Sequence, residues 1–179
     1  MIFPKRNTIT DIKQLKIGND KRNQRISLKP NGFWYSCGDD WYNWIKREKM
    51  TKYLHKYIQQ ININNNVMTD IRNKDKNKLL IIKNVKDFDI FNKRYGKLQD
   101  YLLPIIDNFV MINQYIDWIK VSKDYGGIEI CPYFISRNNY VWYNSWDVAS
   151  GCIWNTKAII KNSELIYEKK KGKYVKTNA

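Results

Sequence analysis

Histidine and cysteine are scarce in this sequence, and their scarcity excludes several kinds of site. Among 179 residues there are one histidine and three cysteines, at positions 37, 131 and 152. No two cysteines form the short pair that zinc sites usually contain, so we expect no metal. An odd number of cysteines without a disulfide framework is typical of a reducing compartment. A nucleophilic Cys152 would need a nearby base, and the basic surroundings of His55 do not favour that role.

Long apolar runs and glycine-rich phosphate motifs are also missing. No stretch approaches the roughly 20 apolar residues of a membrane span. The first residues, Met-Ile-Phe-Pro-Lys-Arg, lack the apolar region of a signal peptide, so we expect a protein that is neither secreted nor bound to a membrane. The chain contains no Walker A pattern and no Gly-x-Gly-x-x-Gly, which argues against nucleotide binding of the usual loop type.

Acidic residues are few beside basic ones. The chain has 32 Lys and Arg against 17 Asp and Glu, a formal net charge of +15, which attracts polyanions such as nucleic acid. The excess lies in residues 1–30, in an expected helix at 46–56 and in 168–176, whereas residues 118–155 are neutral. Lysine dominates over arginine, which does not favour bidentate recognition of bases, so we expect salt-dependent, non-specific binding.

The apolar patterns predict a single compact α+β domain over residues 1–167, with a mixed or antiparallel sheet and several short helices. Residues 168–179 are expected to form a basic, flexible tail. Strands are expected within 26–36 on both sides of a turn, and at 78–83, 128–133, 140–143 and 152–154. Helices are expected from 39–40 towards 60, from 87 or 89, over 99–115 and from 117 to 125, and residues 61–78 are expected to be a polar connection.

Six of the seven tryptophans fall in two windows, 32–44 and 142–155. Tryptophans on neighbouring elements can form a flat-walled slot for a base or a nicotinamide ring, although a tryptophan-rich core is the simpler interpretation for any one of them. Trp34 and Trp146 are the least core-like, because polar Ser36 and Asp147 lie close to them in the sequence.

Two carboxylates are candidates for catalysis. Glu129 is the only acid in an apolar strand, where alternation points it away from its apolar neighbours. In a cleft it would act as a general base or stabilise an oxocarbenium ion, whereas on a half-buried sheet it would face solvent. Asp147 has the same two interpretations, as a catalytic carboxylate or as a turn and cap residue.

A resemblance is carried by Lys-Pro-Asn-Gly-Phe-Trp-Tyr-Ser at 29–36 with Trp41, by Asp117-Trp118, by Tyr-Gly-Gly-Ile-Glu-Ile at 125–130 and by Trp-Asp-Val-Ala-Ser-Gly at 146–151. This pattern resembles a little-characterised family of proteins from large DNA viruses and microbial eukaryotes. The order of its parts is similar to that of ADP-ribosyltransferase-like domains, which begin with a strand-borne motif that binds NAD and end with an acidic residue on a late strand. The resemblance covers about 120 residues.

The resemblance implies NAD as cofactor and a specific set of roles. Trp34 and Tyr35 would enclose the nicotinamide, Ser36 would hydrogen-bond its surroundings, and Lys29 would hold the pyrophosphate. Gly32 and Trp146 would complete the cofactor site. Glu129, or Asp147 in its place, would stabilise the transition state as nicotinamide leaves. The acceptor would be a nucleic acid or a protein, and the location the cytoplasm, a viral replication compartment or a virion.

Two other functions remain open from the sequence. A non-enzymatic basic viral protein would bind nucleic acid through its N-terminal segment and the helix at 46–56, with affinity that falls steeply with salt. A protein-interaction module would use exposed aromatic residues as a partner surface.

Overall fold

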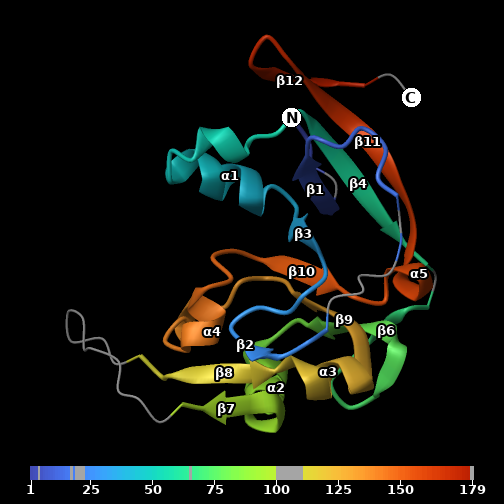
Figure 1. The fold of residues 1–179 in the computed structure, drawn as a ribbon. Coiled ribbons are helices and arrows are strands. Elements are labelled where there is room, and N and C mark those ends of the chain that lie inside the picture. Colours follow the sequence, from blue (N-terminus) through green and yellow to red (C-terminus); the bar gives the residue numbers. More distant parts are fainter. Residues whose placement is uncertain (4, 17, 19–22, 65, 100–110, 178–179) are drawn as a thin grey trace.

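Strands dominate the fold, in a computed structural model that describes residues 1–3, 5–16, 18, 23–64, 66–99 and 111–177 (Figure 1). The larger sheet contains, in spatial order, β12 (Lys173–Lys176), β11 (Ile160–Lys170), β4 (Tyr57–Ile63), β1 (Arg6–Thr10), β3 (Phe33–Cys37), β10 (Ser150–Ile153), β9 (Tyr125–Ile130), β6 (Asp75–Ile82) and β5 (Met68–Thr69). A smaller sheet has the order β2 (Ile26–Ser27), β8 (Gln114–Asp117) and β7 (Gly96–Leu98). The helices are α1 (Asp40–Arg47), α2 (Val85–Tyr95), α3 (Trp118–Asp124), α4 (Val141–Asn144) and α5 (Thr156–Ile159), with 3-10 turns at Thr51–Tyr53 and Ile135–Arg137.

The larger sheet is mixed. Its β5–β6 and β6–β9 pairs are parallel and its other pairs are antiparallel. Figure 1 shows β11, β4 and β1 running steeply in the view and β10 and β9 running nearly across it, with β3 between the two groups. The predicted class, a single compact α+β domain with a mixed or antiparallel sheet and several short helices, is confirmed, and the sheet is mixed.

Helices start where the sequence offers caps. At the start of α2 the Asn84 side chain accepts a hydrogen bond of 2.9 Å from the backbone N–H of Asp87. The helix begins at Val85, two residues before the earliest predicted start at 87. Asp117 was expected to cap a helix, and its carboxylate accepts a 3.0 Å hydrogen bond from the backbone N–H of Lys120. Each bond satisfies one of the free N–H groups in a first helical turn.

The core is divided between the two faces of the larger sheet. On one face, Leu80, Ile82 and Ile128 pack with the aromatic residues of α2, α3 and α4, including Phe88 and Trp142. The opposite face carries a smaller apolar cluster around α5, and α1 packs with β1, β4 and β11 in a third cluster. Strand alternation therefore decides which side chains share a compartment.

Two of the predictions are wrong in the basic segments of the chain, one near residues 46–56 and one at the C-terminal end. The helix expected at 46–56 ends at Arg47, and residues 57–63 form β4 between β1 and β11. The expected flexible tail continues the sheet instead, because residues 168–170 complete β11 and residues 173–176 form β12. Backbone pairing with neighbouring strands and burial of Tyr57 and Tyr167 outweigh the polar composition of both segments.

Other differences lie near the aromatic windows. The expected strand at 140–143 is the short helix α4, which carries the buried Trp142 and Tyr143. The connection expected at 61–78 contains the end of β4, all of β5 and the start of β6. Most of the helix expected at 99–115 lies outside the described residues, and its end is β8.

Candidate functional site

Four tryptophans meet at one surface cavity, which we call the Trp pocket. Its volume is about 290 Å³. The residues that line it come from the loop before β3, β3 itself, α1 and the turn from α4 into β10: Lys29, Trp34, Trp41, Trp44, Trp146, Asp147, Val148 and Ser150. The two sequence windows that hold most of the tryptophans thus form one site.

Local periodicity explains how these side chains converge. Trp34 lies opposite Cys152 across the β3–β10 pair, which places its indole on the α4 side of the sheet. Trp41 and Trp44 lie three residues apart in α1, so they share one face of that helix. Asp147 has a φ of +66°, a conformation that Asp and Asn tolerate better than most residues, and this turn directs the chain from α4 into β10.

The pocket holds a cation of the protein's own. The Lys29 ammonium lies 5.8 Å from the ring centroid of Trp34 and 3.6 Å from a carboxylate oxygen of Asp147. Trp34 also meets Trp146 edge to face, with ring centroids 4.9 Å apart. An aromatic face beside a carboxylate is an arrangement that attracts positive charge. Because the Lys29 and Asp147 side chains are 45% and 40% exposed, both can rearrange around a ligand.

Trp146 has a buried polar atom with no partner. Its side chain is 2% exposed, and its indole N–H has no hydrogen-bond acceptor among the described residues. An unsatisfied buried donor costs about 1–3 kcal/mol, and because this nitrogen is itself buried, an ordered water is its natural partner.

Glu129 lies on the other face of the sheet, in a buried network. Its carboxylate is 3% exposed and accepts hydrogen bonds from the Arg6 guanidinium, one of 2.9 Å, and from the Tyr35 hydroxyl at 2.7 Å. Tyr35 reaches it across β10 because the residue between them is Gly151, where a Cβ would overlap the tyrosine ring. Burial raises the pKa of Tyr35 well above its usual value, so this hydroxyl remains a donor.

A disulfide accompanies this network. Cys37 at the end of β3 and Cys131 just after β9 are bonded, with Cα atoms 6.5 Å apart, and they lie next to Glu129. The interpretation of the cysteines as lacking a disulfide framework is therefore wrong, because strands distant in sequence bring two of them together. Cys152 is free and buried. The bonded sulfur atoms are not thiolates, so this Cys-Glu-Cys group does not offer a thiolate metal site.

The remaining predicted cofactor residues have structural roles. Ser36 is fully buried, and its hydroxyl accepts a 3.0 Å hydrogen bond from the backbone N–H of Trp41. A Cβ on Gly32 would lie 2.7 Å from both Cys152 Sγ and the Ile153 carbonyl oxygen, so glycine lets this loop approach β10.

The predicted residues thus divide into two groups. The Trp pocket brings together Lys29, Trp34, Trp146 and Asp147. Tyr35 and Glu129 face the opposite side, so the predicted single constellation does not assemble. Sequence reasoning did not assign Arg6, the ionic partner of Glu129. The signal available was an arginine in an alternating N-terminal segment, which does not identify its partner.

No protein-family model matches this chain, and no curated protein or solved structure does either. Among the described residues, no helix combines the length and apolar character needed to cross a bilayer.

Proposed function

We propose that this chain binds NAD in the Trp pocket and transfers ADP-ribose from it, with Asp147 as the carboxylate that assists the reaction. The observation that carries the proposal is the convergence of Lys29, Trp34, Trp146 and Asp147 on one cavity. The proposal keeps Lys29, Trp34 and Trp146 from the site expected from the resemblance, and Asp147 takes the role for which Glu129 was the other candidate.

The chemistry of the pocket suits the nicotinamide end of NAD. The oxidised nicotinamide ring is flat and positively charged, and it would replace the Lys29 ammonium over Trp34 and beside Asp147. Lys29, once displaced, would be free to pair with the pyrophosphate.

The protein itself would form no covalent bond in this reaction. The bond between ribose C1′ and the nicotinamide nitrogen breaks, and its electron pair neutralises the ring. The Asp147 carboxylate stabilises the positive charge that develops on the ribose. An acceptor oxygen or nitrogen then forms the new bond to C1′ and releases its proton to solvent or to a base.

The test compares variants that keep the fold. Asp147→Asn removes the charge while tolerating the positive φ at this position, and Trp34→Ala removes the stacking surface. The wild-type chain should be stabilised by NAD in a thermal-shift assay in a manner that survives high salt, by about 2.7 kcal/mol at 100 times Kd. Asp147→Asn should lower NAD turnover at least ~100-fold with a much smaller change in NAD affinity. Trp34→Ala should weaken binding by about 1–2 kcal/mol.

A matched control uses an exposed lysine outside the pocket. Lys29→Gln should weaken NAD binding, whereas Lys86→Gln on α2, which removes the same charge, should not. Absence of any salt-resistant stabilisation by NAD would contradict the proposal, as would unchanged NAD turnover in Asp147→Asn.

A second candidate function is non-specific nucleic-acid binding, which is favoured by one arrangement of charge. Five basic residues between 46 and 56 are exposed: Lys46, Arg47, Lys49, Lys52 and Lys56. The backbone N–H of Lys169 donates to the Lys56 carbonyl at 2.7 Å, which joins this segment to the lysine-rich β11–β12 hairpin. Binding through this surface should fall steeply between 50 and 200 mM salt and should be unaffected by Asp147→Asn.

A further inference from the structure

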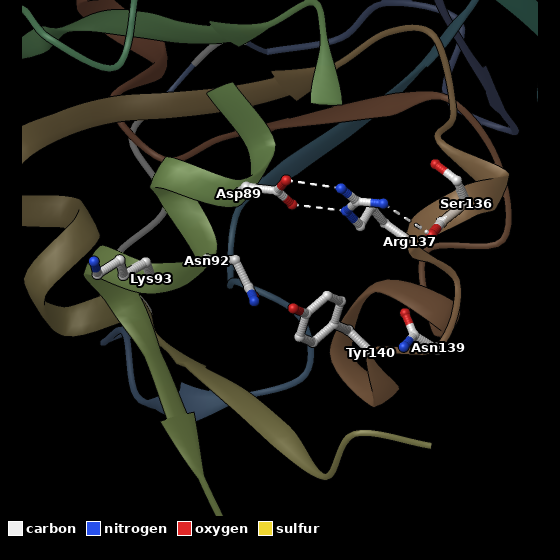
Figure 2. Close-up of a pocket in the computed structure, with 7 residues that line it drawn as sticks. All are labelled: Asp89, Asn92, Lys93, Ser136, Arg137, Asn139 and Tyr140. Carbon is white, nitrogen blue, oxygen red and sulfur yellow. Dashed lines mark hydrogen bonds and ion pairs between the residues drawn. The ribbon is translucent and has the colours of Figure 1, made fainter. Parts of the chain in front are cut away.

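A second cavity is lined by polar side chains from α2 and from the segment before α4. We call it the α2 pocket. Its volume is about 440 Å³, within the usual range for a small-ligand site. Asp89, Asn92 and Lys93 line it from α2, and Arg137, Asn139 and Tyr140 line it from the segment before α4, together with Ser136. Figure 2 shows Asp89 and Asn92 pointing towards Arg137 and Tyr140 across the cavity, whereas the Lys93 side chain extends away from it.

Asn92 presents a fixed hydrogen-bond donor to this cavity. It is 5% exposed, and its Oδ1 accepts a 2.8 Å hydrogen bond from the indole N–H of Trp142. An indole nitrogen can only donate, so the amide of Asn92 must turn its oxygen towards Trp142 and its NH₂ group away from it. Figure 2 shows this nitrogen on the cavity side of α2, with the Tyr140 hydroxyl drawn beyond it and no hydrogen bond marked between the two.

An ion pair between Arg137 and Asp89 joins the two sides of the cavity. Arg137 donates from Nε and Nη2 to the two carboxylate oxygens of Asp89, at 2.7 and 2.8 Å. The pair fixes the segment before α4 against α2. Each carboxylate oxygen retains a free lone pair, so the wall still offers acceptors, and the guanidinium keeps Nη1, which makes only a 3.3 Å contact with the Ser136 carbonyl.

Charge and hydrogen-bonding capacity together restrict the ligand class. The hydroxyl of Ser136 and the amide of Asn139 can both donate and accept, as sugar hydroxyls do. Lys93 is exposed and has no ion-pair partner among the described residues. The two positive charges of Lys93 and Arg137 therefore exceed the single negative charge of Asp89. A polyol that also carries a negative charge satisfies both properties.

We propose that the α2 pocket binds a phosphorylated sugar, with its phosphate near the Asn92 amide, where the exposed Lys93 side chain can turn towards it, and its hydroxyls against Asp89 and Arg137. This site is separate from the Trp pocket and does not depend on the function proposed for it. The two pockets share no lining residue.

The probes are ribose 5-phosphate, ribose and inorganic phosphate, each titrated into the full chain by calorimetry. Ribose 5-phosphate should bind at least about tenfold more tightly than either of the other two, because only it uses both parts of the site. Equal affinity for ribose 5-phosphate and inorganic phosphate would overturn the proposal, and so would the absence of binding to all three.

Variants separate this site from general attraction of anions. Asn92→Asp keeps the oxygen that Trp142 needs but replaces the donor with a negative oxygen, so affinity should fall more than about tenfold. Lys93→Gln should weaken binding, while Lys86→Gln on the same helix should leave it unchanged. An equal loss in the two lysine variants would show that only overall charge matters and would refute the site.

The fold of each variant is monitored by the indole N–H resonance of Trp142 and by thermal melting. Tyr140→Phe provides a second test if Asn92→Asp does not fold, because it removes only the hydroxyl that faces the cavity. Full retention of affinity in folded Asn92→Asp, or in both Tyr140→Phe and Lys93→Gln, would contradict the proposed geometry. NAD binding at the Trp pocket should be unchanged in all of these variants.

Discussion

Replacing Glu129 with glutamine tests whether its carboxylate is structural or catalytic. In Glu129→Gln the side chain keeps its shape and one acceptor oxygen, but the buried guanidinium of Arg6, 7% exposed, loses its counter-charge. Breaking a buried ion pair by removing one partner costs about 3–5 kcal/mol. The isosteric change keeps part of the hydrogen bonding, so we expect a loss of about 3 kcal/mol.

That loss is large compared with the roughly 5–15 kcal/mol that stabilises a typical domain. For a chain of this length it corresponds to a fall in Tm of about 6–12 °C. Urea unfolding followed by tryptophan fluorescence measures the free-energy difference directly.

A variant in which the whole network is replaced provides the control. Arg6→Met, Glu129→Leu and Tyr35→Phe together remove every charge and hydroxyl of the network, so no buried group is left unpaired. Substitution of a complete buried ion pair by apolar residues is often neutral. The triple variant should therefore be more stable than Glu129→Gln.

The refuting result is specific. If Glu129→Gln unfolds within about 1 kcal/mol of the wild type while NAD turnover collapses, Glu129 belongs to the reactive site and the structural role is wrong. If stability falls and residual folded protein turns NAD over normally, the assignment of Asp147 as the assisting carboxylate is strengthened.

Other predictions concern packing, pH and thiol chemistry. Gly151→Ala should destabilise the chain by about 1–3 kcal/mol in chemical denaturation through overlap with the neighbouring tyrosine ring, whereas Gly18→Ala, where a Cβ meets nothing within 4 Å, should be close to neutral. The hydrogen bonds from Arg137 lower the pKa of Asp89 below 3.8. The wild type should therefore be more stable than Asp89→Asn at neutral pH, by less than about 1 kcal/mol for this exposed pair, and the difference should vanish as acid titrates the carboxylate below pH ~4. A stability difference that grows in acid would contradict this prediction. Alkylation in denaturant without reductant should modify one cysteine, Cys152, and all three after reduction; three labels without reductant would disprove the disulfide.

Features encoded by local patterns could be predicted from the sequence. Strand alternation around Trp34 and the helical spacing of Trp41 and Trp44 indicated three of the tryptophans that line the Trp pocket. The pair Trp146-Asp147 lines its other side. Their convergence needs only that β3 and β10 be neighbours, which a compact α+β sheet makes common. The interleaving of strands and short helices along the chain predicted a mixed or antiparallel sheet, and the sheet is mixed.

Features that depend on distant partners could not be predicted. The Arg6–Glu129 pair joins residues 123 positions apart, and the disulfide joins residues 94 positions apart, so no spacing rule reveals either contact. In residues 53–57 the spacing of apolar side chains also fits a helix, and only pairing with β1 and β11 makes Tyr57 the start of a strand.

Strand β3 serves two compartments with consecutive residues. Trp34 faces the cavity proposed to hold NAD, and Tyr35 supports the buried ion pair on the reverse side. A single-residue insertion or deletion within β3 would exchange these faces, which would place the tyrosine in the pocket and an indole against a buried carboxylate. Insertions and deletions in β3 are therefore far less tolerable than substitutions. The specificity of the pocket should diversify through substitutions at Trp34 rather than through changes in the register of the strand.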